Sequence, residues 1–282
     1  MMQTFVASHV FSSGTAFGRI IPGATDKLAL RAPRIHSTRS LPRAVATSSG
    51  LEVLRGGEEE AMMRISNARV SCKTFIDKPV ETDVLERVLR AAQRVPTSFN
   101  TQPYRLVLVS SREAKASLAP TMMKTNREKV LNAAVTVVVL SDLEVDGSRT
   151  TELIKDASPH LAPYAEMIPN MLPVFVGDES KNTTTEWAFK NAGLIGMRLL
   201  DAATSHGLAT AILEGIEDEQ AMLKVIGASG SRYRVPFVIC IGHPDMEAES
   251  ARLGSYVGGR SPRFSLTDIV STDCLSNAGL HL

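Results

Sequence analysis

One short stretch limits the possible folds of this chain more than any other. Residues 133–140 read AAVTVVVL, a run of apolar and β-branched residues without a charge. Such a run lacks the alternation of a half-exposed strand and is typical of a strand that is buried on both faces. Residues 237–241 read FVICI and predict a second buried strand. We therefore expect a sheet that other elements cover.

Other segments predict the elements around this sheet. Tyr104–Val109 and Leu208–Leu213 are expected as strands. A helix is predicted over Pro79–Val95, with Thr82 as its N-cap, and Pro96 ends it. The remaining predicted helices are a segment with Met62, Ile65 and Ala68 on one face, Trp187–His206 followed by Gly207, and Asp218–Val225. Helices and strands alternate irregularly, which favours an α+β sandwich over a regular βαβ winding.

Two segments do not fit a regular element. Pro96–Pro103 reads PTSFNTQP and is predicted as a loop, because Pro, Thr, Ser and Asn favour local bonds between side chain and backbone. Residues 142–183 contain four prolines, which would break any long helix or strand. We expect an insertion or a mobile cover there.

The N-terminal residues differ in composition from the rest of the chain. Residues 1–49 hold a single acidic residue, Asp26, among several arginines and many Ser, Thr and Ala residues. This pattern is typical of a cleavable organelle-targeting segment, which leaves residues 50–282 as the folded domain. We expect a mitochondrial address, with a plastid address as the alternative. A disordered tail without an address is the third interpretation.

Charge and composition argue against several classes of protein. The chain is 44% hydrophobic and 22% charged, and its formal net charge of +1 does not suggest a nucleic-acid partner. No apolar run reaches the ~18–20 residues of a membrane span. Cys72, Cys240 and Cys274 lie far apart and predict neither a disulfide framework nor a metal site. The motifs of Rossmann dehydrogenases, P-loop NTPases, serine hydrolases and zincins are missing.

Five separated segments agree with one known family. Residues 69–75 (RVSCKTF) resemble the R-x-S-x-R/K-x-F opening of nitroreductases, and residues 96–104 (PTSFNTQPY) resemble their P-S-S-x-N-x-Q-P-W loop. Residues 126–129 (NREK), the turn at residues 213–215 (LEG) and the basic tail at residues 260–263 (RSPR) resemble three further segments. The order and spacing agree over about residues 64–270, although the tail is one residue off the K-x-R spacing of the family.

The resemblance implies a fold, a cofactor and a reaction. Nitroreductases are three-layer α+β sandwiches with a central, mostly antiparallel sheet, and they form intertwined homodimers with a flavin site at the interface. FMN would be the cofactor, NADH or NADPH the electron donor, and a nitroaromatic, a quinone or a similar small molecule the acceptor. A hydride would pass through flavin N5 with ping-pong kinetics, because one pocket serves both substrates. Neither nucleic acid nor stable membrane insertion is expected.

The same resemblance assigns residues to the FMN phosphate. Arg69, Ser71 and Arg263 would bind it through guanidinium and hydroxyl donors, with Arg260 as a weaker match. Because Arg69 and Ser71 are two residues apart, they point the same way only in an extended or turning segment. The first helix should therefore end near Ala68.

Further residues are assigned to the flavin ring. Lys73 would stabilise the negative charge of the reduced ring, with Asn126 and Lys129 as a second donor set. Glu214 and Gly215 would present a backbone N–H to flavin N5, so Lys73 and Glu214 are the candidate catalytic residues. The residues expected to reach the flavin from the other subunit are Pro96, Thr97, Ser98 and Asn100.

Other interpretations of these residues and of the scaffold remain open at this stage. Taken alone, Lys73 and Lys129 also fit solvated surface lysines, and Glu214 fits a turn residue. Cys72 is expected as a packed small residue rather than a redox centre, and Trp187 as a core or interface residue. The alternative functions are another reductive chemistry on the same scaffold, such as dehalogenation or flavin fragmentation, and a non-catalytic flavin-binding scaffold.

Overall fold

A computed structural model of the chain describes residues 57–144, 147–157, 162–167, 183–255 and 261–274. The chain divides into one unit of residues 1–53 and a second unit of residues 54–282, and every described residue belongs to the second. The predicted targeting segment and Arg260 lie outside the described residues.

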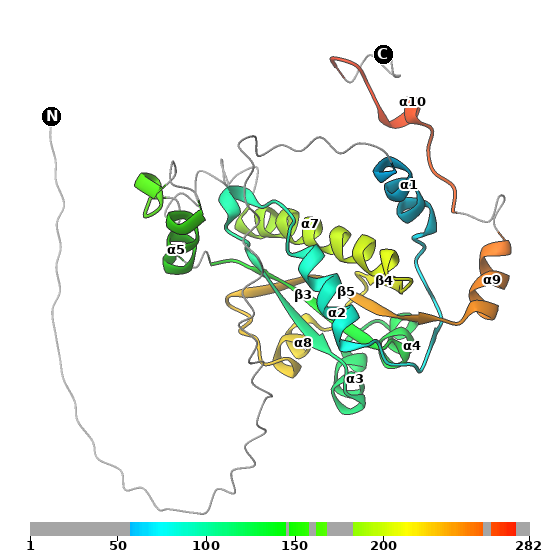
Figure 1. The fold of residues 1–282 in the computed structure, drawn as a ribbon. Coiled ribbons are helices and arrows are strands. Elements are labelled where there is room, and N and C mark those ends of the chain that lie inside the picture. The colour runs from blue at the N-terminus through cyan, green and yellow to red at the C-terminus, as the bar shows by residue number, and fades with distance from the viewer. Residues whose placement is uncertain (1–56, 145–146, 158–161, 168–182, 256–260, 275–282) are drawn as a thin grey trace, which may run out of the picture. The chain divides into compact units, whose positions relative to one another are not determined.

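An antiparallel sheet forms the centre of the described unit (Figure 1). Along the sheet, β1 (Phe75–Ile76) pairs with β5 (Tyr233–Pro244), which pairs with β3 (Val135–Asp142), which pairs with β2 (Tyr104–Val109). β4 (Ala209–Leu213) also pairs with β5. The pairs between these strands all run antiparallel.

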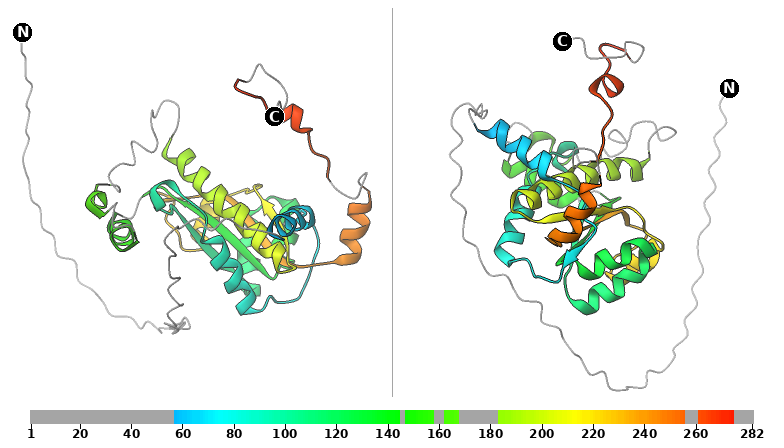
Figure 2. Two further views of the ribbon diagram at one scale, coloured as in Figure 1. Left: turned by 45° about the horizontal axis from the view of Figure 1, so that its top comes forward. Right: turned by 90° about the vertical axis from the view of Figure 1, so that its right-hand side faces the viewer.

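Helices cover both faces of this sheet. α2 (Thr82–Ala92) and α7 (Thr184–Ser205) contribute to the core on one face, and α3 (Arg112–Leu118), α4 (Lys124–Asn132) and α8 (Glu219–Val225) to the core on the other. Figure 2 shows the strands between these two groups of helices. The predicted three-layer α+β sandwich is therefore confirmed.

The alternation of side chains along β3 explains why both faces of the sheet are buried. Val137 and Val139 pack in the core with α2 and α7, whereas Val138 and Leu140 pack in the core with α3, α4 and α8. Every residue of β3 is buried, as the uncharged run predicted. The strand begins two residues later than predicted, because Ala133 is the C-cap of α4.

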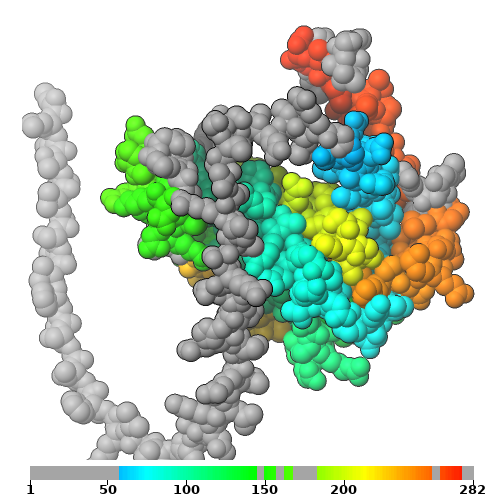
Figure 3. Space-filling model, viewed as in Figure 1, coloured from blue at the N-terminus to red at the C-terminus, as the bar shows by residue number. Residues whose placement is uncertain are grey.

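The remaining elements are short or lie at the periphery. α1 contacts α7, and Figure 3 shows α1, α2 and α7 on one surface. Hydrophobic periodicity did not predict α3, α4 and α9, whose sequences are short and largely polar. The bounds not yet given are α1 (Glu58–Ala68), η1 (Ser98–Asn100), η2 (Ala119–Thr121), α5 (Gly147–Ala157), η3 (Ala162–Tyr164), α9 (Met246–Gly254) and α10 (Leu266–Ile269).

Two predictions about helices need correction. The helix with Met62, Ile65 and Ala68 on one face does form, but α1 contains no buried residue: Met62 and Ala68 are exposed and Ile65 is half-buried. The helix predicted over Pro79–Val95 has Glu81 as its N-cap, not Thr82. Glu81 is extended with ψ 135°, so Thr82 is already the first helical residue.

Two other segments are more regular than the sequence suggested. The strand predicted over residues 237–241 runs from Tyr233 to Pro244 and passes through Pro236. The register against β3 shifts between Val139 and Ser141, and this irregularity accommodates a proline that cannot donate to the ladder. Within residues 142–183, the described part includes α5 and η3.

Two glycines of α7 provide a test of the packing between this helix and the sheet. A Cβ atom at Gly196 would lie 2.5 Å from Cζ of Phe237, whereas a Cβ atom at Gly193 would meet nothing within 4 Å. Gly193→Ala should raise the free energy of unfolding by up to ~1 kcal/mol, because alanine favours the helix. Gly196→Ala should lower it by about 1–3 kcal/mol, because the buried ring of Phe237 must move. Denaturant unfolding measures both effects, and equal gains would contradict the close contact.

Candidate functional site

α1 ends where the first motif begins. Ala68 is its last residue, and its C-cap Arg69 is extended with φ −67° and ψ 116°. The backbone then lies beside β4, where Ser71 forms a parallel bridge with Thr210 and the Cys72 N–H donates to the Thr210 carbonyl at 2.8 Å. The predicted end of the helix and the extended segment after it are confirmed.

A buried glutamate of α9 holds this segment. Glu249 is 5% exposed, and its Oε1 accepts the N–H groups of Lys73 at 2.9 Å and Thr74 at 3.0 Å. Its Oε2 accepts two hydrogen bonds from Arg252, at 3.2 and 2.6 Å. Arg252 also donates to the Ser71 carbonyl at 3.1 Å. One carboxylate and one guanidinium group therefore fix the backbone that carries the candidate side chains.

No sequence pattern indicated either of these residues. In a polar helix, Glu249 and Arg252 resemble an ordinary solvated i,i+3 pair, and only the placement of α9 buries the carboxylate. Burial by itself raises the pKa of Glu249, but the hydrogen bonds from Arg252 and from the N–H groups of Lys73 and Thr74 outweigh it, so the pKa is lowered. The carboxylate therefore stays charged at neutral pH.

A cavity of about 470 Å³ opens over this segment and is rich in hydrogen-bond donors. Four cationic side chains line it but no carboxylate among the described residues does, so an anion would be attracted there. Arg263 is exposed and also donates to the carbonyls of Ser261 and Pro262. The cations are Arg69, Lys73, Arg252 and Arg263, and the hydroxyl groups are those of Ser66, Ser71 and Ser261.

A second group of predicted residues meets where β4 ends. The Asn126 Nδ2 donates to the Gly215 carbonyl at 3.3 Å, and the Lys129 Nζ donates to the Asn126 Oδ1 at 3.1 Å. Burial lowers the pKa of Lys129, and the positive charge of Lys73 lowers it further. The charge of Lys73 in the cavity therefore acts on Lys129, which lies in the corner formed by Asn126, Lys129 and Gly215.

The lack of a side chain at Gly215 is required for this corner. A Cβ atom there would lie 2.8 Å from Asn126 Nδ2 and 2.8 Å from Met123 Sδ. The Gly215 carbonyl also accepts the Met123 N–H at 3.0 Å, which ties the start of α4 to the end of β4. The side chain of Glu214 is exposed.

The Pro96–Asn100 loop lies at a different cavity of the same chain. The Ser98 N–H donates to Asn191 Oδ1 at 3.1 Å, and Trp187 Nε1 donates to Ser98 Oγ at 3.3 Å. Pro96, Thr97 and Ser98 line this cavity with residues of α7, and none of the described residues that line the cationic cavity belongs to the loop. Within one chain, the described residues predicted for the phosphate form one cluster, and most of those predicted for the flavin ring form another. The predicted Pro96–Asn100 loop lies apart from both.

Two residues singled out by the sequence have structural roles. Cys72 is 1% exposed, and burial followed by the nearby charge of Glu249 raises its pKa to about 11, which suits a packed thiol. Trp187 is 2% exposed and belongs to the interior, where it contacts the loop through Ser98.

The described residues hold neither a candidate membrane span nor a candidate metal cluster. None of their helices is both long and apolar enough to cross a membrane. No group of three His, Cys, Asp or Glu side chains that could hold a metal ion occurs among them.

Comparison with known proteins identifies the class of protein. The chain belongs to the nitroreductase family, whose family model matches residues 67–243. A Burkholderia lata protein with the provisional name NADH dehydrogenase/NAD(P)H nitroreductase is 32% identical over 193 residues, which cover 68% of this chain and 86% of that protein.

Two solved structures have the same fold. The provisional nitroreductase ydfN of Bacillus subtilis matches with a TM-score of 0.64 at 18% identity, over 76% of this chain and 99% of that one. A provisional Exiguobacterium sibiricum nitroreductase in complex with FMN matches with a TM-score of 0.59 at 22% identity, over 74% and 96% of the two chains.

The lowered pKa of Glu249 predicts a pH-dependent stability. A carboxyl group with a depressed pKa in the folded state stabilises the fold above its unfolded pKa, which is 4.5, and the contribution is lost as the pH falls through the folded pKa. Glu249→Gln should lower the free energy of unfolding by about 2 kcal/mol at pH 7. The difference from the wild type should shrink below pH 4.5. Urea unfolding between pH 7 and pH 3 measures this, and a constant difference would contradict it.

Proposed function

We propose that this protein is an FMN-dependent oxidoreductase that takes a hydride from NADH or NADPH and passes it to a nitroaromatic, quinone or similar acceptor. The observation that carries this proposal is the cationic cavity over residues 69–74, whose Lys73 also lowers the pKa of Lys129 through its positive charge. Membership of the nitroreductase family supports it, as do the FMN complex of the Exiguobacterium protein and the name of the Burkholderia relative.

The residues of the cavity fit the phosphate of FMN. A phosphate monoester carries close to two negative charges and accepts several hydrogen bonds, and guanidinium forks with a hydroxyl donor match both properties. Arg69, Ser71 and Arg263 would hold this group, and Arg260 is a further candidate outside the described residues. Arg252 would contribute charge, although it already binds Glu249 and the Ser71 carbonyl.

The Lys129 corner fits the ring of the cofactor. FMN, when bound, supplies the acceptance and release of the hydride at its N5 atom. Lys73 and Lys129 would stabilise negative charge on the pyrimidine edge, and Asn126 would donate a hydrogen bond there. The backbone at Glu214 and Gly215 would approach the ring closely, because Gly215 has no side chain. In this proposal the chain supplies binding, orientation and electrostatics.

We infer that the working form is a homodimer. Proteins of the nitroreductase family are typically dimeric, and several large apolar side chains on the described surface are exposed. A second copy would bring Pro96, Thr97, Ser98 and Asn100 to the cationic cavity of its partner, which would unite the three groups of residues. The exposed apolar residues on α1, α7 and the C-terminal segment are Met62, Met63, Leu194, Met197, Phe264, Leu266 and Ile269.

The proposal for the location of the protein rests on composition. We propose that residues 1–49 direct import into a mitochondrion, with a plastid as the alternative, because they are basic, rich in hydroxyl groups and almost free of carboxylates. The match to the family model begins at residue 67, after this segment. Imaging of a fluorescent fusion with and without residues 1–49 distinguishes the two organelles from an untargeted tail.

Another reductive chemistry on the same scaffold, such as dehalogenation or flavin fragmentation, is the first alternative. A protein that binds FMN without turnover is the second. Rapid reduction by a nicotinamide donor would argue against the second alternative, because a scaffold needs no reaction with such a donor.

The absorption spectrum of the full-length protein tests the proposed cofactor and donor. We expect flavin bands near ~450 nm that bleach within seconds when NADH or NADPH is added without oxygen, because the donor would stack at the flavin. The faster of the two nucleotides identifies the donor. Colourless protein that FMN does not reconstitute would contradict the proposal, and yellow protein that neither nucleotide reduces would favour the scaffold.

A single substitution tests the proposed phosphate site. Arg69→Gln should weaken FMN binding to the apoprotein by about 10–100-fold, because charge-assisted hydrogen bonds to the phosphate are lost. Titration with quenching of flavin fluorescence measures the affinity. Arg64→Gln is the matched control, since Arg64 is an exposed arginine of α1 outside the cavity. Equal affinity of the two variants would rule out Arg69 as a phosphate ligand.

A further inference from the structure

The segment that carries the candidate site sorts its side chains onto two sides. Arg69, Ser71 and Lys73 line the cationic cavity, whereas Cys72 between them packs in the core. Side chains two residues apart lie on the same side of an extended chain, so this order holds only while the backbone stays extended. The positions of the three cavity side chains therefore depend on what holds the backbone from Ser71 to Thr74.

Two side chains of α9 hold this backbone. The Glu249 carboxylate accepts the N–H groups of Lys73 and Thr74 through Oε1, in the way that a neighbouring strand would. The Arg252 guanidinium group joins Oε2 of the same carboxylate to the Ser71 carbonyl. One ion pair thus reaches the segment at three consecutive positions after its bridge with β4.

The central sheet fixes the position of α9. The helix begins directly after β5, and the carboxylate of its N-cap Asp245 accepts the Ala248 N–H. The Asp245 N–H donates to the Thr74 carbonyl at 3.0 Å, so the start of the helix is attached to the segment as well. Glu249 lies in the first turn of the helix. The end of β5 therefore places this carboxylate beside the segment.

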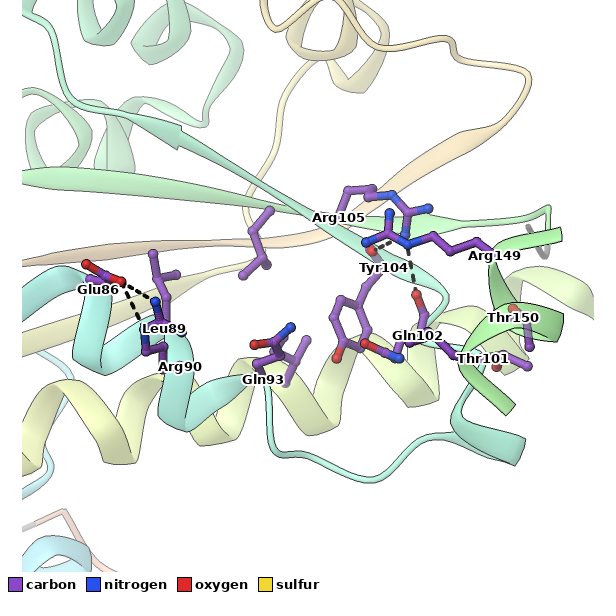
Figure 4. A pocket seen from close by; sticks show the side chains of 13 residues that line it. Glu86, Leu89, Arg90, Gln93, Thr101, Gln102, Tyr104, Arg105, Arg149 and Thr150 are labelled. Atoms are coloured by element: carbon purple, nitrogen blue, oxygen red, sulfur yellow. Dashed lines mark hydrogen bonds and ion pairs between the residues drawn. The ribbon is translucent and has the colours of Figure 1, made fainter. Parts of the chain in front are cut away.

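This ion pair differs from an ordinary surface pair. Glu86 and Arg90 of α2 form a surface pair, which Figure 4 shows at a separate cavity between α2, β2, α5 and α7. Both of their side chains are more than half exposed, so water and salt weaken the attraction. The Glu249 side chain is only 6% exposed. A buried carboxylate costs free energy unless hydrogen bonds satisfy it, and Glu249 accepts them from Arg252 and from two backbone N–H groups.

The carboxylate contacts Lys73 through the backbone N–H group. The ammonium group of Lys73 lies near enough to Lys129 to lower the pKa of that lysine. A carboxylate that paired with this ammonium group would cancel a charge that a negatively charged ligand needs. The arrangement therefore fixes the main chain of Lys73 and keeps its charge on the side of the cavity.

We propose that Glu249 and Arg252 are positioning residues for the FMN site. Glu249 acts on the flavin ring through the backbone of Lys73. Arg252 acts on the phosphate through the Ser71 carbonyl, because its guanidinium fork binds this carbonyl and the carboxylate at once. The pair keeps the phosphate contacts and the ring contact at a fixed spacing along one extended segment. This inference rests on the proposed FMN function, and its first test does not need the cofactor.

The first test measures the backbone in FMN-free, full-length protein. Glu249→Asp keeps the charge but is one methylene group shorter, whereas Glu249→Gln loses the charge but keeps the length. Glu249→Asp should speed hydrogen exchange of the Lys73 and Thr74 amides at least ~10-fold, because their acceptor no longer reaches both. Glu249→Gln should change it less than ~3-fold, since its amide oxygen still accepts. Mass spectrometry of peptides that cover residues 70–76 measures the exchange.

The second test measures the reduction potential of the FMN-loaded protein by spectroelectrochemical titration. In Glu249→Asp the reduced flavin should be ~10-fold less stable relative to the oxidised form, which is a fall of about 30 mV for two electrons. Glu249→Gln should stay within ~3-fold of the wild type. A direct effect of the carboxylate charge predicts the opposite pattern. Glu249→Gln would then raise the potential, because a negative charge is lost, and Glu249→Asp would leave it unchanged.

Arg252→Lys tests the phosphate end of the pair. Lysine keeps the charge but lacks the fork that binds the Glu249 carboxylate and the Ser71 carbonyl together. FMN binding to the apoprotein should weaken about 5-fold, while the potential of the bound flavin stays within ~3-fold of the wild type. Quenching of flavin fluorescence measures the affinity. Because Glu249 is unchanged in this variant, it tests the pair even where Glu249→Asp does not fold.

Glu219→Gln is the matched control. The Glu219 carboxylate accepts hydrogen bonds from Arg234 Nε at 3.0 and 3.1 Å and from the Val235 N–H at 2.6 Å, so it also joins a guanidinium group to a backbone N–H group. It lines neither the cationic cavity nor the cavity beside Pro96–Ser98. This variant should unfold at a lower urea concentration but keep the exchange of residues 70–76, the FMN affinity and the potential of the wild type.

Four results would overturn the proposal. The first is unchanged amide exchange in Glu249→Asp, and the second is a potential that rises in Glu249→Gln and stays constant in Glu249→Asp. The third is wild-type FMN affinity in Arg252→Lys. The fourth is an equal change in the Glu219→Gln control, which would trace the effects to general destabilisation. Protein that binds no FMN would refute the proposed function together with this inference, whereas FMN-loaded protein with these results would refute this inference alone.

Discussion

The pairing of β5 is the constraint on which the rest of the structure depends. β5 pairs with β3 and β4 along its length and with β1 at its end, and its central residues are buried on both faces. Its backbone hydrogen bonds are therefore formed where water cannot replace them. Segments attached to this strand carry the candidate site. β1 follows Lys73, β4 leads into Gly215, and α9 with Glu249 begins just after Pro244.

The candidate site brings several positively charged side chains close together, and the neighbouring carboxylate of Glu249 does not neutralise them. Arg69, Lys73 and Arg263 share one cavity, and Lys129 has a lowered pKa from burial and from the charge of Lys73. Such a cluster is most stable when an anion occupies it. Glu249 does not fill this role, because its carboxylate accepts backbone N–H groups and Arg252 instead. It fixes the backbone and leaves the cationic side chains available to a ligand.

Regular elements with strong local patterns were predicted well. The uncharged run marked β3, the bounds of β2 (Tyr104–Val109) agree with the prediction, and α7 differs by a few residues. Helices α3, α4 and α9 were missed because short polar helices are stabilised by tertiary packing more than by their own sequence. The bulge that admits Pro236 into β5 depends on the partner strand, so its position follows from the pairing and not from the proline itself.

The sequence by itself determined the family, the layered α+β architecture and most of the residues of the candidate site, because motifs preserve the type and spacing of side chains along the chain. The tertiary structure alone decided which of these residues meet. It joined residues 69–74 to β4 and α9, kept the Pro96–Asn100 loop apart from them, and buried the Tyr104 hydroxyl group without a hydrogen-bond partner among the described residues. The physical reason is that burial and hydrogen-bond partners arise between segments far apart in the chain, where no local pattern records them.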